Sequence, residues 1–493
     1  EQGKQHHGNS INGYEANAKL SDDGFNNLAK FSGIALLDAY VYTNFNAGKV
    51  PIDLRLGRQV VNWGESTFIQ GGLNVVNPVD ISALRRPGAE LKEALLPVAM
   101  IYGSFGLTNA LTLEAFYQFE WERYQLEGCG TYWSSADPAP EGCDALTAFN
   151  SFTDQEMLGN VAFGPFNPPG SVYRDGDEEP SDTGQYGISL KYFAEKLGST
   201  EFGLYYMRYH SRVPMLSGFN GNINSLAPLL SDQLPTYTLA FPEEIDLYGL
   251  SFNTNIAGWS LGGELSYRPN LPLDINTTNT FQAIALGNAA PWSSQLGRAQ
   301  AAGNGGFVAG WDDVEYTQLQ FTTIRSWYAV MGASQFSFVG EIGGNYIDGM
   351  ETDQFYGRAP TYGIGDFGTL DDGQTCSSTS ALGVNPNNVA SNCTDEGFYT
   401  HFAWGYRLRA VWRYDGAIGG VNLQPQLAWN HDVNGYAPIP AGFNEGAKAL
   451  GFALNGDYQN RYSFGISYNM FFGGDYNVIT DRDFLSMNVG MAF

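Results

Sequence analysis

The C-terminal segment is the feature that most constrains what this chain can fold into. From Asp483 to Phe493, apolar side chains alternate with small or polar ones, and the last residue is a phenylalanine. Successive side chains of a β-strand point to opposite faces, so this segment predicts a strand with one apolar face. The apolar face would carry Leu485, Met487, Val489, Met491 and Phe493, and the other face Ser486, Asn488, Gly490 and Ala492. One face for lipid and one for water are typical of a transmembrane β-barrel strand.

The composition favours one large barrel over the two or three soluble domains that a length of 493 residues would indicate on average. Aromatic residues make up 14 % of the chain, yet its mean hydropathy is −0.23. No run of about 18 apolar residues occurs, which excludes a spanning helix. Strands that alternate between lipid and water spread hydrophobicity thinly, and this composition fits that pattern.

Amphipathic runs of roughly ten residues recur along the chain, joined alternately by very short turns and by long polar loops. The long loops are centred near residues 80, 150, 230, 290, 370 and 440. We count about fifteen runs from residue 33 onward, the last of which leads into the periplasm. Bacterial single-chain barrels have even strand numbers, so we expect an all-β, antiparallel barrel of about 16 to 18 strands when complete.

The odd count leaves three explanations open. One or three strands are missing upstream of Glu1, residues 1–32 are an external loop, or the count is wrong by one. Residues 1–32 contain much Asn, Gly and Asp and no good strand, so we expect an N-terminal extension or loop there. Residues 33–493 are then expected to form the barrel. No signal peptide opens the chain at Glu1, so we expect a mature or truncated sequence, and we favour the first explanation, a truncated N-terminus.

The net charge of −26 comes from acidic clusters rather than from the predicted strands. Asp175 to Glu179 and Asp366 to Asp372 are two such clusters, and both look like solvated loops. Nucleic acid is excluded as a partner because its binding needs a basic face. Outer-membrane lipid and lipopolysaccharide are the expected surroundings, and acidic loops on the cell surface would share divalent cations with lipopolysaccharide phosphates or simply keep the loops solvated.

Four cysteines form two local pairs, each within one polar segment between predicted strands. We expect two disulfides inside loops, Cys129 with Cys143 and Cys376 with Cys393. These spacings, without neighbouring histidines, fit neither a redox motif nor a zinc site, so no metal or cofactor is expected. Disulfides indicate an oxidising compartment, which agrees with the outer membrane of a Gram-negative bacterium.

Charged side chains within the predicted strands are expected to face the interior, because arginine and glutamate are costly in hydrocarbon. The predicted lumen wall consists of Glu114, Glu120, Arg208, His210, Arg268, Glu341, His401, Arg407, Arg409 and Arg413. Both signs are present. These charges either pair with one another to stiffen the barrel or line a pore and select its cargo.

Residues 64–97, between the second and third predicted strands, are too apolar for a free external loop and are expected to fold into the barrel. Ala89 to Leu95 would form a short helix after Pro87 and Gly88. The segment is either a gate that forms the constriction or a fixed plug. Its candidate path residues are Phe68, Ile69, Val75, Val76, Arg85, Arg86, Glu90, Leu91, Glu93 and Leu95.

Several stretches carry a family resemblance. They are LGxQVxNWGES from Leu56, NPxDxxxLRxPGAELxEALLP from Asn77, residues 113–122 and residues 472–477. These stretches resemble a proteobacterial outer-membrane family catalogued only as a domain of unknown function. The terminal phenylalanine also resembles the signal that hands outer-membrane proteins to their assembly machinery.

The resemblance implies a trans-envelope route for hydrophobic small molecules or lipids. Members are similar in size to long-chain fatty-acid transporters, and their genes tend to accompany a periplasmic lipoprotein-carrier-like protein and an inner-membrane transporter of the RND superfamily. The resemblance supplies no catalytic residue.

Three other functions compete with a channel for hydrophobic molecules. A structural or adhesive surface barrel would lack a continuous path through its lumen. A general or carbohydrate-type porin would have an open aqueous path with segregated charges. An outer-membrane hydrolase would need a serine or carboxylate constellation, but no GxSxG elbow accompanies the five histidines, so we expect no enzyme.

Overall fold

The computed structural model describes residues 22–85, 94–134, 138–142, 145–147, 171–221, 235–287, 290–381, 389–459 and 461–492. Fifteen strands form one sheet, in which sequence neighbours pair antiparallel along its whole width. In sheet order the strands are β1 (Ala39–Ala47), β2 (Val50–Gln59), β3 (Val98–Thr108), β4 (Leu111–Gln118), β7 (Tyr186–Ala194), β8 (Thr200–Tyr209), β11 (Ile245–Ile256), β12 (Trp259–Asp274), β14 (Trp311–Tyr328), β15 (Gln335–Asp348), β16 (Phe402–Ile418), β17 (Val421–Asn434), β18 (Lys448–Tyr458), β19 (Tyr462–Phe472) and β20 (Phe484–Met491). The all-β class and the count of about fifteen strands are confirmed.

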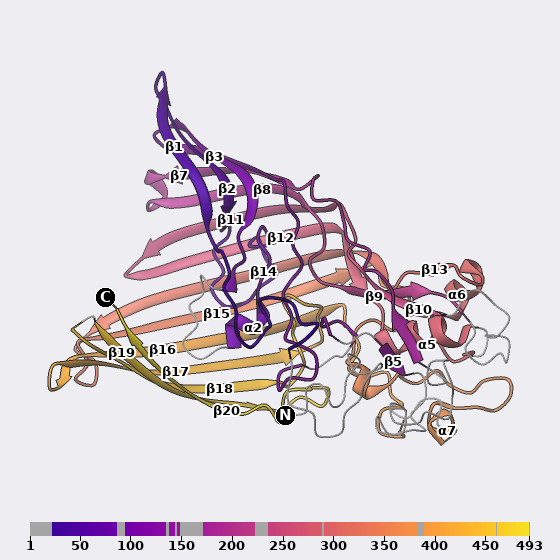
Figure 1. Cartoon of the computed structure of the whole chain (residues 1–493). Coiled ribbons are helices and arrows are strands. Elements are labelled where there is room, and N and C mark those ends of the chain that lie inside the picture. Colours follow the sequence, from indigo (N-terminus) through magenta and orange to yellow (C-terminus); the bar gives the residue numbers. More distant parts are fainter. Residues whose placement is uncertain are drawn as a thin grey trace.

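The sheet curves around a concave face (Figure 1). Short turns join strand pairs at one end, as where Ile418 pairs with Val421 and Tyr458 with Tyr462. The long connections gather at the opposite end (Figure 1). Within the described residues no pairing joins β1 to β20, and none of the described helices is long and apolar enough to cross a membrane.

The two faces of the sheet differ as the alternation predicts. On β20, Leu485, Met487 and Val489 are 59 %, 65 % and 88 % exposed on the outer face. The inner face carries Ser486, whose hydroxyl is 2.6 Å from that of Ser467 on β19. An outward apolar face and an inward polar face are what a lipid-embedded strand requires.

An aromatic band lies on the outer face near the short turns. The ring centroids of Trp259 and Trp327 are 5.6 Å apart, those of Trp327 and Phe336 5.5 Å, and those of Phe336 and Trp412 4.9 Å. The Arg325 guanidinium lies over both tryptophan rings, at 5.1 and 5.0 Å. Such bands are typical of the border between hydrocarbon and lipid headgroups.

A second sheet of five short strands lies at the end with the long connections (Figure 1). Its order is β13 (Phe307–Val308), β9 (Met215–Phe219), β10 (Thr236–Ala240), β6 (Ser171–Arg174) and β5 (Ala145–Thr147). Helices α5 (Thr277–Leu286) and α6 (Leu296–Ala302) pack against it, and Ile284 of α5 is fully buried with Val308. The sequence had predicted long loops centred near residues 150, 230 and 290. Positions 150 and 230 lie outside the described residues, and the short strands and helices that flank the three positions were not predicted.

An ion-pair cluster holds one margin of this second sheet. Asp177 bonds to Arg123 and to Arg174, each at 2.7 Å. Burial is the largest influence on its carboxyl and acts to raise the pKa, but the two arginines together outweigh it and lower the pKa of Asp177. The carboxylate is therefore held charged.

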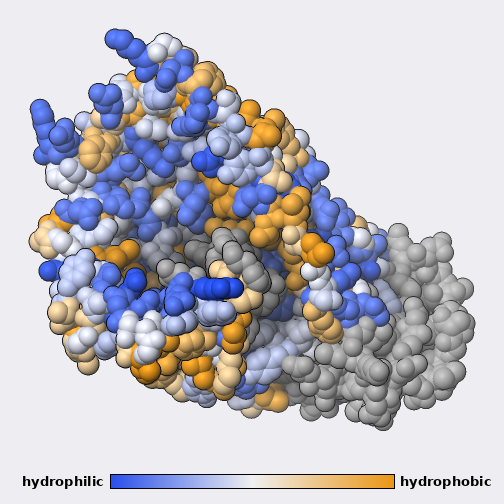
Figure 2. Space-filling model, turned by 60° about the vertical axis from the view of Figure 1, so that its left-hand side comes forward, coloured by the Kyte–Doolittle hydropathy of each residue, from blue (hydrophilic) through white to orange (hydrophobic). Residues whose placement is uncertain are grey.

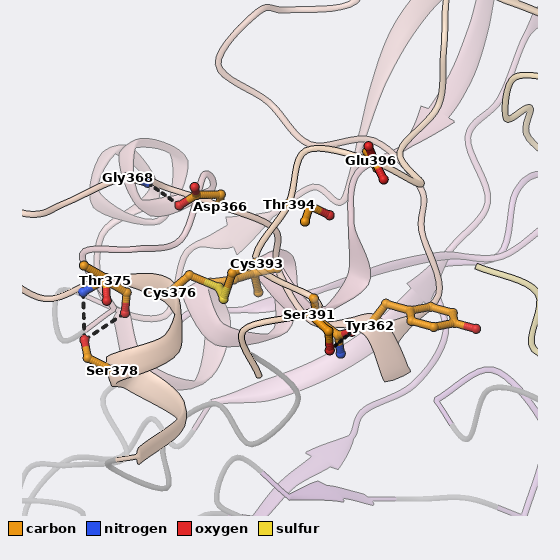
Figure 3. Close-up of a disulfide and its surroundings, with 12 residues drawn as sticks. Tyr362, Asp366, Gly368, Thr375, Cys376, Ser378, Ser391, Cys393, Thr394 and Glu396 are labelled. Carbon is orange, nitrogen blue, oxygen red and sulfur yellow. Dashed lines mark hydrogen bonds between the residues drawn. A yellow bond between two sulfur atoms is a disulfide. The ribbon is translucent and has the colours of Figure 1, made fainter. Parts of the chain in front are cut away.

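The connection between β15 and β16 contains the 3₁₀ turn η6 (Pro360–Tyr362), helix α7 (Cys376–Ala381) and a disulfide (Figure 3). Cys376 and Cys393 are bonded at an S–S distance of 1.92 Å, which confirms the second predicted disulfide. Arg358 organises the same connection: its guanidinium donates to the carbonyl oxygens of Thr394 at 2.8 Å and Tyr362 at 2.6 Å. The partner expected for Cys129, Cys143, lies outside the described residues.

Candidate functional site

Residues 61–80, here called the inward segment, lie against the concave face of the sheet. Trp63 is fully buried, donates its indole N–H to Glu114 of β4 at 2.8 Å, and packs against Phe116 and Tyr205. Further along, the segment contributes Leu73, Val75 and Val76 to the same cluster, which also contains side chains of β3, β8 and β11. The expectation that this region folds against the interior agrees with this packing.

Two carboxylates from the wall bind the backbone of the inward segment. Glu264 of β12 accepts the N–H groups of Glu65 at 2.6 Å, Ser66 at 3.2 Å and Leu73 at 3.0 Å. The side chain of Glu264 also accepts from the Gln320 amide. The residue is 3 % exposed, and no described cation forms an ion pair with it. The amides of the segment therefore take the place of a counter-ion.

Glu341 of β15 repeats this arrangement a few residues along the segment. It accepts the N–H groups of Thr67 at 2.5 Å, Phe68 at 3.0 Å and Ile69. The hydroxyl of Thr322 on β14 donates to it at 2.7 Å. Hydrogen bonds to a buried carboxylate are about twice as strong as neutral ones, so these two glutamates are strong anchors.

Cationic and amide side chains bind the carbonyl groups of the same segment. Arg268 of β12 donates to the carbonyl oxygens of Gly71 and Gly72, both at 2.7 Å. Arg212, beyond the end of β8, donates to the Val76 carbonyl at 2.8 Å, and burial lowers the pKa of Arg212 to about 10. The segment is thus fixed through both its donors and its acceptors.

Two glycines allow this close approach. A Cβ at Gly72 would lie 1.8 Å from a carboxylate oxygen of Glu264, so no other residue fits without displacing the anchor. Gly64 has φ of +107° and would place a Cβ 2.5 Å from the same carboxylate. The glycines in this stretch are explained by the anchor they contact.

Beyond Ile69, which packs with Ala403, Ala441 and Phe443, the wall is not covered by the inward segment. Two adjoining hollows of about 370 and 330 Å³ extend along the inner face of β16 to β20, with Phe68 at one side. We call this space the recess. Its wall includes Arg407, Arg409, Gln426, Ala428, Asn430, Gly451, Ala453, Ser467 and Asn469.

The recess has one aromatic end. Trp133, from the connection after β4, lies 5.2 Å from Phe484 and 6.0 Å from Phe471, measured between ring centroids. The hydroxyl of the preceding Tyr132 donates to the carbonyl oxygens of Asp481 and Asp483 at 3.1 Å. This contact ties a segment from near one margin of the sheet to the strands at the other margin.

The cations of the recess are neutralised to different degrees. Arg407 is bonded to Asp432 at 2.5 Å. Arg409 is exposed and its guanidinium bonds to the neutral amide of Gln426 at 2.5 Å; no ion pair to it occurs among the described residues. Figure 2 looks toward the short-turn end and shows a hollow there with hydrophilic residues prevailing around it. The space inside the sheet is therefore mostly polar, with one aromatic end.

The structure separates the predicted path residues into three groups. Phe68 faces the recess. Ile69, Val75 and Val76 are buried in wall contacts, and Leu95 pairs with Val79 in an isolated bridge. Helix α2 (Ile81–Arg85) precedes a stretch outside the described residues, where Arg86, Glu90, Leu91, Glu93 and most of the predicted helix from Ala89 lie; the side chain of Arg85 is likewise not described.

The predicted lumen residues also divide. Glu114, Arg268, Glu341, Arg407 and Arg409 lie on the concave face, and Arg413, on the same face of β16, pairs with Asp415 at 2.7 Å. The other four lie elsewhere and correct the prediction.

Arg208 lies on the outer face of β8, where it bonds to Asp246 at 2.9 Å. The inner face of β8, which carries Met207, is apolar because the inward segment packs against it. His210, past the end of β8, bonds to the Thr183 carbonyl at 2.9 Å. His401 stacks on Tyr346, an outer-face residue of β15, and Glu120, past the end of β4, pairs with Arg58. Strand alternation does not extend past a strand end, which explains the last three.

Sequence reasoning did not single out Trp133, Gln426 or Asn469 as recess residues. Gln426 and Asn469 follow from the alternation in β17 and β19 and were recoverable from it. Trp133 lies in a connection and carries no local signal.

Comparison with solved structures returned outer-membrane channels at low similarity. Pseudomonas aeruginosa OccK9 (OpdG) is 11 % identical, with 89 % of this chain and 73 % of that chain covered and a TM-score of 0.31. Acinetobacter baumannii OccAB1 is 10 % identical, with 86 % of this chain and 69 % of that chain covered and a TM-score of 0.32. The A. baumannii outer membrane channel DcaP is 6 % identical, with 87 % of this chain and 83 % of that chain covered and a TM-score of 0.28. Scores this low carry no argument about function.

No curated protein matches the sequence. A family model, in contrast, matches the chain over its entire length, in agreement with the resemblance seen in the sequence motifs. The chain belongs to the family described as "Protein of unknown function (DUF1302)", matched over residues 1–493.

Proposed function

We propose that this protein is a channel of the Gram-negative outer membrane, through which small molecules diffuse along the recess. The observation that carries the proposal is the combination of an outward apolar sheet face, an inward polar face and an anchored segment that narrows the space between them. Aqueous pores of transmembrane barrels are built in this way, with a lipid-facing surface and a lumen restricted by an inward loop.

Two cargo classes compete. The resemblance implies hydrophobic small molecules or lipids, and the aromatic end of the recess supports a cargo with an apolar part. However, Ile69, Val75 and Val76 are used in packing against the wall and are not offered to a cargo. The polar wall supports the second candidate, a diffusion porin for polar solutes.

The partners implied by the family stay proposals. A periplasmic lipoprotein-carrier-like protein and an inner-membrane RND transporter would meet the barrel at its short-turn end, where the hollow opens (Figure 2). Outer-membrane lipid and lipopolysaccharide would surround its outer face.

Single-channel recording in planar bilayers tests the channel proposal. Ala428 lines both parts of the recess, and Leu427 lies next to it on the opposite face of β17. We expect Ala428→Trp to lower the conductance, because the indole would fill part of the recess, and Leu427→Trp to leave it unchanged. A protein without conductance, or equal effects of the two variants, would overturn the proposal.

A further inference from the structure

We propose that the recess binds amphipathic organic anions, that is, molecules with a flat apolar body and one acidic group. This inference rests on the proposed function and names the cargo class of the same site. It depends on two features at neighbouring levels of the wall: a positioned aromatic cluster and an arginine that has no acidic partner among the described residues.

The aromatic cluster is held in place before any cargo arrives. The ring of Trp133 stands at 90° to that of Phe484 and at 81° to that of Phe471. The guanidinium of Arg482 lies 5.2 Å from the ring of Tyr132, which adds to the two hydrogen bonds of the Tyr132 hydroxyl. Rigid aromatic side chains bind flat apolar groups at low entropic cost, because little side-chain freedom remains to be lost.

Arg409 supplies the charge. Its neighbour Arg407 is neutralised by Asp432, whereas the described contact of Arg409 is with the amide of Gln426, which is neutral. A guanidinium offers paired N–H donors that match a carboxylate or sulfonate. In a chain with a net charge of −26, this exposed cation is a local attraction for anions inside a polar wall.

The strand register places the two features within reach of one molecule. Asn469, Gly451, Ala428 and Arg409 are paired in sequence across β19, β18, β17 and β16. Phe471 is two residues from Asn469 along β19, about 7 Å away. Three strand spacings of about 4.8 Å separate β19 from β16, so a molecule that contacts both features needs its apolar ring and its acidic group joined by a chain of several carbon atoms.

The wall between these features leaves space and offers polar contacts. Gly451 and Ala428 are small, and Asn430 and Asn469 present amides beside them. Hollows of about 370 and 330 Å³ are large enough for a small organic molecule. Phe68 from the inward segment borders the same space.

Blockage of the potassium chloride current through the reconstituted protein tests the proposal, with 6-phenylhexanoate, hexanoate and 6-phenylhexanol as probes. Phenylhexanoate has both the ring and the charge, joined by a five-carbon chain, whereas each of the other two lacks one of them. We expect phenylhexanoate to block at concentrations about tenfold lower than either. Arg409→Gln should abolish the advantage of phenylhexanoate over phenylhexanol, and Trp133→Ala its advantage over hexanoate.

Arg413→Gln is the matched control, because Arg413 lies on the same face of the same strand but pairs with Asp415 away from the recess. It should leave the blockage by phenylhexanoate unchanged. Equal blockage by the three probes, or equal effects of Arg409→Gln and Arg413→Gln, would overturn the proposal while the current itself still supports a channel.

Equilibrium dialysis of radiolabelled 6-phenylhexanoate against the purified protein tests the site without any current. Binding that Arg409→Gln weakens and Arg413→Gln does not would support the site even if no channel opened. Binding that neither variant changes would overturn it.

Discussion

Replacing Glu264 with glutamine should loosen the inward segment and widen the recess. One carboxylate oxygen accepts the N–H groups of Glu65 and Ser66, and the other accepts those of Leu73 and the Gln320 side chain. A glutamine keeps one acceptor oxygen and turns a donor NH₂ toward the remaining amides. At least two buried N–H groups then lose their acceptor.

The magnitude follows from that count. A buried donor left without a partner costs about 1 to 3 kcal/mol, so two of them cost about 2 to 6 kcal/mol. Since about 1.4 kcal/mol is a factor of ten, the population in which the segment is detached should rise roughly 30-fold or more. Glu341→Gln should act in the same direction on residues 67–69, and the double variant should exceed either one.

Hydrogen exchange and single-channel recording measure this together. Backbone amides 65–73 should exchange faster in Glu264→Gln while the strand amides stay protected, and the open conductance should rise or fluctuate. Glu315→Gln is the control, because Glu315 lies on the adjacent strand β14 and accepts a solvent-exposed hydrogen bond from the Tyr267 hydroxyl at 2.8 Å. Unchanged protection of amides 65–73 would refute the idea that the carboxylates anchor the segment.

Three further outcomes are expected. Gly72→Ala should reproduce the loosening caused by Glu264→Gln, because its Cβ would lie 1.8 Å from the carboxylate, and hydrogen exchange of the same amides checks it. Cys376→Ser should make the connection that contains Cys393 more sensitive to protease without changing conductance, since a bridge across 17 residues stabilises a loop by about 3 kcal/mol. The pKa of Asp177 is lowered because its two arginine contacts outweigh burial. The contribution of this carboxylate to the stability of the second sheet should therefore be complete above about pH 5 and be lost as the pH falls below about 4. Proteolysis at graded pH checks this, and Asp177→Asn should remove the pH dependence.

The sequence by itself determined the features that follow from a pattern repeated between neighbouring residues or neighbouring segments. Successive side chains of a strand point to opposite faces, so the outward apolar residues of β20 and the inward arginines of β16 were predictable from the chain alone. The alternation of short turns and long connections likewise fixed the number and order of strands in the main sheet. These are local properties, because each depends on residues next to one another.

The tertiary structure decided what depends on contacts between distant residues. The second sheet pairs β10 with β6 in parallel, and such short strands have no sequence signal stronger than that of a loop. Arg208 turned outward because the inward segment occupies the opposite face of its strand. That segment in turn owes its position to Glu264 and Glu341, roughly 200 and 270 residues further along the chain.

The character of the recess also came from packing. The sequence showed an apolar segment and indicated an apolar path, but most of those side chains are buried against the wall, where burial in a close-packed interior stabilises them most. What they leave uncovered is the polar face of the last strands, joined to an aromatic cluster that Trp133 completes from far away in the chain. Hydrophobicity determined that the segment would be buried, and only the three-dimensional arrangement determined which surface remained for a cargo.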